Sequence, residues 1–430
     1  MLDLLAQLTA QSLVQTIEQG RTTRYRLLET VRQYAREQLL THDEAAIFLE
    51  RHRSWFLRLL ARAGEGMRTA ERGTWLDRLD DDLDNLRLAL TSSMARADQR
   101  EAILGLAEPL CRFCLERGYQ EEGHRWLVLA LADGCGGATA ARAHALNAAG
   151  TLANERGEHR QAMALYAEGL ALFRALGDRR GSARVLINQG TLLKFQGERE
   201  QARTLYEAGH AIVQELDDRP LLALALNNLG TLAIEQGDHT RATAALEQSL
   251  LLKRQVGNQD SIVHALINLG EVARWLGDSA RATSLFEEAL ARAGAVGARA
   301  YVALVHYNLG LVARAQGDHR GAAAEFQQSV ILEHELGNRR QIAANLEGLA
   351  GLAVARKQRE RAGRLFGAAG ALRQRIDTPL TPADRIQHGR DRDLLHAGVD
   401  EAVVSAAWSA GEALTLDEII ALATDTSPGL

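Results

Sequence analysis

The chain has 430 residues, of which 46% are hydrophobic, 24% charged and only 5% aromatic, and it contains five prolines. This mixture is typical of a folded helical protein and excludes a β-sandwich or barrel, which needs more β-branched and aromatic residues. The formal net charge of −5 argues against a general nucleic-acid binder. Three cysteines are too few for a disulfide framework, no apolar run approaches the length of about 20 residues that spans a membrane, and the N-terminus lacks a basic signal region. We therefore expect a cytoplasmic protein.

The pattern in residues 1–42 predicts a helix, a β-hairpin and a second helix. Two short strands, 13–17 and 24–28, flank a turn at Gln19-Gly20, and the second helix begins near Thr30. This order resembles the back half of a winged-helix domain. Arginines on the hairpin are suited to phosphate contacts, so a DNA-binding regulator acting through this segment is the alternative function. The arginines concerned are Arg21, Arg24 and Arg26.

The pattern in residues 43–101 predicts a helical connector. An acidic run and a CxxC motif in or near it could suggest metal sites, but neither has the full ligand pattern that such a site needs. The acidic run from Asp77 to Asp84 lacks the glycine and distal glutamate of a calcium loop, so we interpret it as a solvated helix face. Cys111 and Cys114 form a CxxC without a second pair, which favours two core side chains over a zinc site. No Ser-His-Asp or Cys-His set emerges either. We expect no catalytic residue, cofactor or metal.

An internal repeat of 40 residues dominates the rest of the chain. Several markers keep this period in register: one glycine, a second glycine seven residues later, an alanine, and a large side chain four residues after it. The markers are Gly150, Gly190, Gly230, Gly270 and Gly310; Gly157, Gly197, Gly237, Gly277 and Gly317; Ala162, Ala202, Ala242, Ala282, Ala322 and Ala362; and Tyr166, Tyr206, Leu246, Phe286, Phe326 and Phe366.

Each repeat predicts a helix–turn–helix pair. In one copy, Gly230 lies inside the first helix, where glycine costs about 1 kcal/mol against alanine, so a partner helix must come close there. Gly237 ends that helix as a left-handed C′ residue, and Asp238 is a suitable N-cap for the next. The recurring asparagines predict hydrogen bonds between repeats. They are Asn188, Asn228, Asn268 and Asn308.

These units resemble the tetratricopeptide repeat, as the segments NNLGTLAIEQGDHTRATAALEQSL and YNLGLVARAQGDHRGAAAEFQQSV illustrate. The resemblance covers residues 102–376 and implies an all-α solenoid of about seven helix pairs. Its first copy is degenerate around Gly118, Gly123 and Trp126, and in its last copy Lys357 replaces the turn glycine. Such imperfect end copies suit the capping of a solenoid.

The flanks extend the resemblance to bacterial signal-transduction (STAND-type) ATPases, which are transcriptional regulators with winged-helix and repeat regions. The segments SLV, RYRLLETVRQYA and WLDRLDDDLDNLRLAL carry it, together with a tail, DRDLLHAGVDEAVVSAAWSAGEALTLDEIIALA. No GxxxxGK[ST] motif occurs, so the chain resembles the C-terminal sensor half of such a regulator. We expect a partial winged helix in 1–42, a connector in 43–101, the solenoid in 102–376 and a helical cap in 377–430.

The resemblance implies that the first helices of the repeats line a concave groove. The outward stripe on these helices varies between copies and mixes amides, cations and aromatics, a mixture that suits a bound peptide. We therefore expect a non-enzymatic scaffold that binds a protein or peptide and serves a separate or upstream ATPase module. An ordinary solvated face is the competing interpretation, as is a core position for Trp275. The candidate groove residues are His144, Asn147, Asn154, Arg184, Lys194, Asn227, Glu271, Arg274, Trp275, Tyr307 and Arg314.

Overall fold

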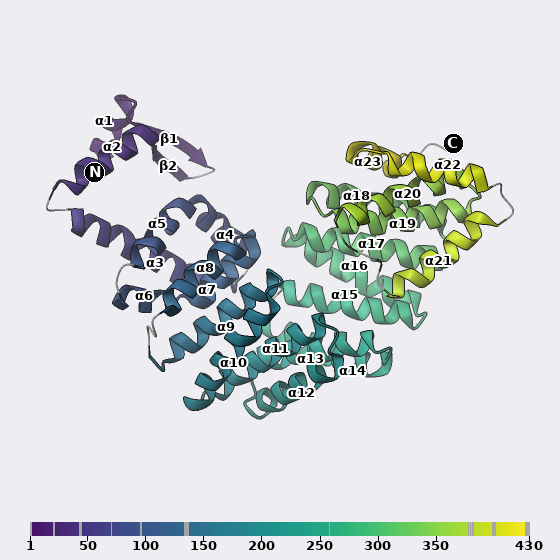
Figure 1. Cartoon of the computed structure of the whole chain (residues 1–430), viewed down its shortest axis with the longest axis horizontal. Coiled ribbons are helices and arrows are strands. Elements are labelled where there is room, and N and C mark those ends of the chain that lie inside the picture. The colour runs from purple at the N-terminus through teal and green to yellow at the C-terminus, as the bar shows by residue number, and fades with distance from the viewer. Residues whose placement is uncertain are drawn as a thin grey trace. The chain divides into compact units, whose positions relative to one another are not determined.

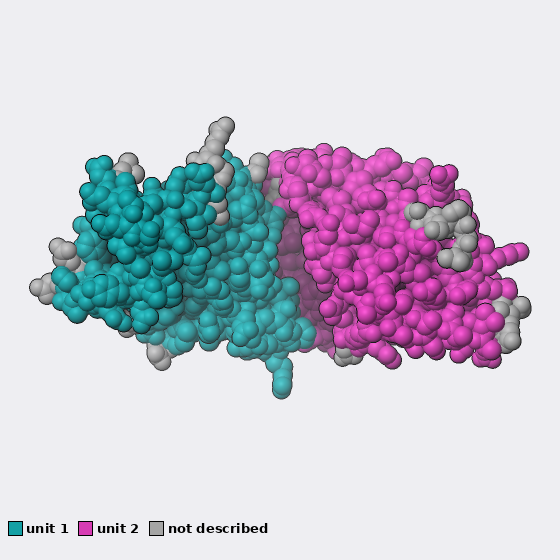
Figure 2. Space-filling view, turned by 90° about the horizontal axis from the view of Figure 1, so that it is seen from above, with its two compact units in different colours: residues 1–172 teal, residues 173–430 magenta. Residues whose placement is uncertain are grey.

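A computed structural model describes most of the chain. The described residues are 2–19, 22–42, 45–69, 71–94, 97–132, 137–257, 259–376, 378, 380, 382–397 and 401–425. The chain divides into two compact units, residues 1–172 and 173–430 (Figure 2). None of the helices in these ranges is both long and apolar enough to cross a membrane.

The first unit opens with the helix–hairpin–helix order that the sequence predicts. The elements are α1 (Leu2–Ala10), β1 (Val14–Gln19), β2 (Thr22–Leu27) and α2 (Glu29–Leu40), and the strands pair antiparallel with Val14 opposite Leu27 (Figure 1). Among the described residues of this segment only Val14 is buried, and α2 buries none of its side chains. The helix–hairpin–helix order expected of a partial winged helix is therefore present, but these elements enclose no core of their own.

The predicted connector is helical and builds the main core of the first unit with the first repeats. Its helices are α3 (Ala45–Gly66), α4 (Arg72–Asp81), α5 (Leu83–Ser93) and α6 (Ala97–Leu104). Leu60, Leu79 and Leu90 are fully buried in a cluster that also contains Phe113 and Trp126. The connector thus shares one hydrophobic core with the degenerate first repeat.

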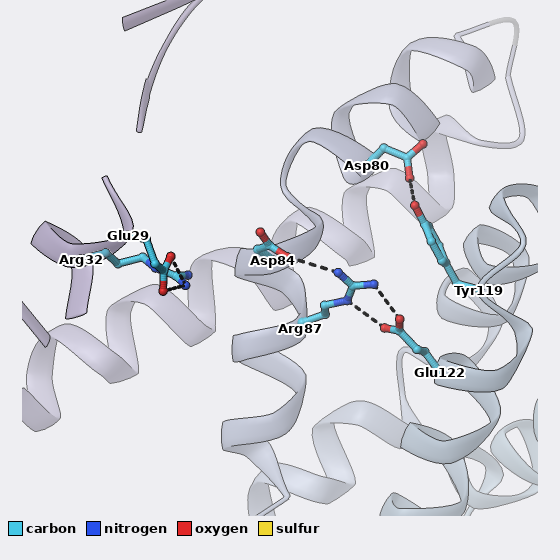
Figure 3. A network of polar contacts seen from close by, with 7 residues as sticks. All are labelled: Glu29, Arg32, Asp80, Asp84, Arg87, Tyr119 and Glu122. Carbon is cyan, nitrogen blue, oxygen red and sulfur yellow. Dashed lines mark hydrogen bonds and ion pairs between the residues drawn. The ribbon is translucent and has the colours of Figure 1, made fainter. Parts of the chain in front are cut away.

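A polar network fastens α5 to that first repeat (Figure 3). Arg87 donates from Nε and Nη2 to the two carboxylate oxygens of Glu122, at 2.9 and 2.6 Å, and from Nη1 to Asp84 at 3.2 Å. The Tyr119 hydroxyl donates to Asp80 at 3.1 Å. The bond from Arg87 lowers the pKa of the Glu122 carboxyl. Part of the acidic run is therefore paired rather than merely solvated.

Seven consecutive helix pairs follow, in agreement with the 40-residue period (Figure 1). In the first unit these are α7 (Ala107–Arg117) with α8 (Gln120–Leu131), and α9 (Ala140–Glu155) with α10 (His159–Ala175). In the second unit they are α11 (Arg179–Phe195) with α12 (Arg199–Glu215), α13 (Arg219–Glu235) with α14 (His239–Val256), α15 (Gln259–Trp275) with α16 (Ser279–Ala295), α17 (Arg299–Ala315) with α18 (His319–Glu335), and α19 (Arg339–Ala355) with α20 (Arg359–Arg375).

The roles predicted for Gly230, Gly237 and Asp238 are confirmed in the pair α13–α14. A Cβ on Gly230 would lie 2.6 Å from Leu246 Cγ, which explains why a glycine stands inside the helix. Gly237 has a φ of 77°, and the Asp238 side chain accepts the backbone N–H of Arg241 at 3.0 Å. In the last copy Lys357 takes the left-handed conformation itself, with a φ of 61°.

Three helices close the second unit: α21 (Pro382–His396), α22 (Glu401–Glu412) and α23 (Leu416–Thr424). Helix α22 packs closely on α20, since a Cβ on Gly367 would lie 2.1 Å from the carbonyl oxygen of Trp408. A capping box formed by Thr415 and Glu418 starts α23. Ile419 and Ala423 of α23 lie in the same buried cluster as Phe366 of α20. Helix α23 therefore helps to cover the apolar face of the last helix pair, α19 with α20.

Candidate functional site

The predicted groove residues of the first unit lie on α9. His144 and Asn147 are half-buried and both engage other groups. Asn154 is buried at 9% exposure, and its side-chain oxygen has no hydrogen-bond partner among the described residues. These three polar side chains all lie on one helix of the first unit.

Two candidates on α11 and one on α13 have their charges or amides occupied. Arg184 is half-buried and engaged, and the Lys194 ammonium lies 3.7 Å from the Glu235 carboxylate. Asn227 differs from expectation, because it is 3% exposed and its side-chain oxygen accepts Lys253 Nζ at 2.8 Å. Asn227 therefore belongs to an interior polar pair instead of an open groove face.

Four of the remaining candidates meet at one cavity of about 420 Å³. Arg274 and Trp275 come from the end of α15, while Tyr307 and Arg314 come from α17. Helix α17 supplies two further lining residues, and helices α19 and α21 supply the others. The remaining lining residues are Leu311, Ala315, Ala344, Glu347, Gly348, Gln387, His388, Arg390 and Asp391.

Two ion pairs neutralise most of the charge in this cavity. Arg314 donates from Nη2 to both carboxylate oxygens of Asp391, at 2.6 and 2.7 Å. Glu347 accepts Arg373 Nε at 2.6 Å and Nη2 at 2.8 Å. The four side chains are between 6% and 18% exposed, so these pairs are shielded from water and salt.

Arg274 stands apart from these pairs. Its guanidinium lies over the Trp275 ring at 4.9 Å, and its Nε is buried without a hydrogen-bond partner in the described part of the chain. Trp275 is 47% exposed and its ring stacks on His239, with the centroids 6.5 Å apart. This exposure excludes the core interpretation of Trp275. Glu271 lies one turn earlier, and burial raises the pKa of its carboxyl although Arg274 opposes the shift.

The side of the cavity formed by α21 could not be predicted from the sequence. Asp391 is 4% exposed and Gln387 Nε2 donates to it at 3.0 Å, while the His388 ring meets Phe366 edge-on at 4.9 Å. Helix α21 lies outside the 40-residue repeat, so no periodic position marks these residues. Glu347, in contrast, occupies the same repeat position as Tyr307 and was within reach of a stricter alignment.

The remaining sequence interpretations can be placed directly. Asn228 Nδ2 donates to Thr191 at 3.3 Å and Asn268 Nδ2 to Asn227 at 3.4 Å, which confirms the predicted bonds between repeats. Asn308 departs from this pattern, because its side chain donates instead to the Leu304 carbonyl of its own helix at 3.0 Å.

Cysteine and arginine candidates outside the repeats have structural contacts. Cys111 and Cys114 are buried in the core, and desolvation raises the pKa of the Cys111 thiol to about 12; Cys135 lies outside the described residues. Arg24 donates to the Asp81 carbonyl at 2.9 Å and pairs with Asp82. Arg21 also lies outside the described residues. Within the described ranges, no group of three or more His, Cys, Asp or Glu residues is placed to hold a metal ion.

Comparisons with known proteins agree with this architecture. The tetratricopeptide-repeat family model matches residues 181–255 and 261–330. A provisionally named HTH-type transcriptional regulator, Rv0890c of Mycobacterium tuberculosis, is 38% identical over 133 residues, which are 31% of this chain and 15% of the relative. Its counterpart Mb0914c of Mycobacterium bovis gives the same values, so the match spans about one seventh of these relatives.

Two solved structures share the fold at 16% sequence identity. One is the STAND protein with a tetratricopeptide-repeat sensor, PH0952 from Pyrococcus horikoshii, with a TM-score of 0.60 over 95% of this chain and 58% of that one. The other is the apo form of the quorum sensor NprR from B. thuringiensis, with a TM-score of 0.57 over 86% and 96%. The repeat region of this chain is a tetratricopeptide-repeat solenoid.

Proposed function

We propose that this chain is a non-enzymatic scaffold that binds a protein or peptide along the first helices of its repeats. The observation that carries the proposal is the cavity on α15 and α17. Two consecutive first helices bring an exposed tryptophan, a tyrosine and two arginines to one hollow. Aromatic and arginine side chains grouped in this way are typical of the energetic centres of protein interfaces.

We further propose that this scaffold is the sensor region of a bacterial signal-transduction or transcription-regulating ATPase system in the cytoplasm. The support is the resemblance of the flanking segments, together with the similarity to a STAND sensor, a quorum sensor and a transcriptional regulator. The ATPase module would be encoded upstream in the same chain or on a separate one. Each of these is an assignment by similarity of architecture.

The described contacts favour this function over DNA binding through the N-terminal hairpin. Arg24, which the alternative needs for phosphate contacts, is held by the Asp81 carbonyl and the Asp82 carboxylate. A phosphate would have to displace these acceptors and lie beside two carboxylates, which repel it. DNA binding is accordingly not proposed.

Trp275→Ala tests the binding function. Peptides selected by phage display on the wild-type chain should bind this variant about 30-fold more weakly, because an aromatic anchor contributes about 2 kcal/mol or more. Thermal unfolding should change little, since the side chain is 47% exposed. Trp55→Ala is the matched control, because Trp55 is 54% exposed on α3, far along the chain from the groove. Equal peptide affinities for wild type and Trp275→Ala would rule out this cavity as the binding centre.

A further inference from the structure

The cavity has the size of a small-ligand site. Its volume of about 420 Å³ lies within the range of roughly 300–1,000 Å³ that is usual for such sites. Three successive first helices, α15, α17 and α19, form its floor, and α21 forms a wall. The ion pair between Arg314 of α17 and Asp391 of α21, in which Nη2 donates to both carboxylate oxygens, holds that wall across the face of the repeats.

This wall limits what can lie in the groove. An extended chain that follows the first helices toward α19 meets α21 at the cavity, where Gln387 and Asp391 face it. The guanidinium of Arg314 is no longer available to such a chain, because it is 18% exposed and both its carboxylate contacts are made. The cavity is therefore suited to the end of a peptide rather than to its middle.

The positive charge that the two ion pairs leave in the cavity favours the carboxyl end of a peptide over its amino end. Arg314 is matched by Asp391 and Glu347 by Arg373, so Arg274 and Arg390 are the lining cations without an ion pair in the described part of the chain. Arg390 is exposed, whereas Arg274 is half-buried with an unpartnered Nε. A carboxylate gains from such a site, and an amino terminus is repelled by it.

The apolar part of the lining favours an apolar group in the ligand beside its carboxylate. The Trp275 indole is half in solvent, and Tyr307 and Leu311 are half-buried beside it in the same lining. A partly exposed indole, a phenol ring and an isobutyl group suit an aromatic or aliphatic side chain. The ligand chemistry is thus a carboxylate close to an apolar group.

We propose that this cavity binds the C-terminal residue of a peptide, with the free carboxylate on Arg274 and an aromatic or aliphatic side chain against Trp275, Tyr307 and Leu311. The inference rests on the peptide-binding function proposed above and names the part of the peptide that enters the cavity. Helix α21 acts as the stop that fixes where the peptide ends.

The test uses two matched probe pairs and isothermal titration calorimetry with the full chain. The first pair is N-acetyl-phenylalanine and its amide; the second is an alanine-rich hexapeptide that ends in phenylalanine, with a free or an amidated C-terminus. Both acids should bind at least 10-fold more tightly than their amides. The hexapeptide acid should bind at least 10-fold more tightly than N-acetyl-phenylalanine, because a peptide also contacts the groove before the cavity.

Arg274→Gln should remove the difference between acid and amide, while Arg281→Gln should leave it intact. Arg281 is a fair control because it lies on the second helix α16, is 40% exposed and pairs with Glu247. Thermal melts of both variants show whether the fold is kept. Equal binding of acid and amide, no binding by any probe, or an unchanged preference in Arg274→Gln would overturn the proposal.

A carboxylate beside an apolar group could belong to a small aromatic acid or to the end of a peptide, and the length of the probe distinguishes the two. If N-acetyl-phenylalanine and the hexapeptide acid bind equally, the cavity is a site for a small aromatic acid and the peptide-end proposal is wrong. If phage-selected peptides bind through Trp275 but ignore amidation of their C-termini, the scaffold function stands and only the terminal pocket fails.

Discussion

Five glycines, each 40 residues from the next, form notches that receive a large side chain from the partner helix. A Cβ on Gly150 or Gly190 would lie 2.7 Å from the ring of Tyr166 or Tyr206, and one on Gly270 would lie 2.5 Å from Phe286. The receiving rings are at most 1% exposed. Because these contacts leave no room for a methyl group, the helix tolerates the conformational cost of glycine.

Gly270→Ala should lower the free energy of unfolding by about 1–3 kcal/mol, because the added methyl group forces the Phe286 ring out of its packed position. Urea denaturation measures the change. Gly294→Ala on α16 is the control, since a Cβ there meets nothing within 4 Å and the site is exposed. That variant should gain up to about 1 kcal/mol from helix propensity. A neutral or stabilising Gly270→Ala would contradict the notch.

One position of the second helix carries buried charges in some repeats and apolar side chains in others. Val213 and Ala293 are apolar there, while Lys253, Glu333 and Arg373 are charged. Lys253 and Glu333 are 7% and 2% exposed, and burial lowers the pKa of Lys253 to about 8. A charge at a position that is otherwise apolar is a signal that the sequence already contains, and it marks the interior polar pairs.

Glu333→Gln should remove a pH dependence of stability between about pH 4.5 and 7. Burial raises the pKa of Glu333 from 4.5 to about 7, so over this window the folded chain keeps a proton that the unfolded chain has released. The free energy of unfolding of wild type should therefore fall as the pH rises, by up to about 3 kcal/mol. Urea denaturation at pH 4.5 and 7.5 compares the two proteins. Parallel pH profiles for wild type and variant would show that Glu333 does not titrate in this range.

At the scale of elements, α21 is fastened by few contacts. Among its described side chains only Asp391 and Leu395 are buried. The helix depends on the ion pair with Arg314, on Leu395 and on the edge contact between His388 and Phe366. Segments held in this way open more easily than the packed pairs beside them.

Asp391→Asn should loosen α21 while leaving the repeats intact. The amide keeps one acceptor oxygen but loses the charge that matches Arg314 in a shielded site. Hydrogen exchange of residues 382–397 should accelerate at least 10-fold, with no change in α15–α18. Asp393→Asn, an exposed site on the same helix, should have no effect. Unaltered exchange in Asp391→Asn would show that Leu395 and His388 suffice to hold the helix.

The helices and turns of the repeats could be predicted from the sequence, whereas the packing of α21 against the repeats could not. Period, glycine turns and caps such as Asp238 predict each helix pair, because the information lies within 40 residues. The bond between Arg314 and Asp391 joins residues 77 positions apart and follows no period. For the same reason four residues on α15 and α17 could be predicted for the site, whereas the α21 side of the cavity could not.

At the scale of the whole molecule, the second unit repeats surface ion pairs as well as its core contacts. In the second unit Arg241 pairs with Glu207, and 40 residues later Arg281 pairs with Glu247. Both pairs are 40–54% exposed, so each contributes little, about 0–1 kcal/mol. Stability therefore rests on the notches and the buried faces of neighbouring pairs.

In the first unit, the N-terminal elements form as the sequence predicts, but they do not pack into a core of their own. The hairpin and helices of residues 2–42 form where their patterns predict, yet large apolar side chains on them stay exposed. Tyr34 is 63% exposed and Leu40 is 59% exposed. Local patterns specify such elements, but a core requires partners that these residues do not supply among themselves.

The notch also bears on how such a chain diversifies. Some groove candidates stand three residues before a notch glycine or four after it: Tyr307 precedes Gly310, and Arg274 follows Gly270, with Trp275 one residue further on. Helix pairing depends on the glycine and the ring, and of these two groove side chains Tyr307 also packs against a notch ring, that of Phe326, with the centroids 5.9 Å apart. An exchange at Arg274 can therefore alter the surface of the groove without altering a notch ring, whereas an exchange at Tyr307 alters both.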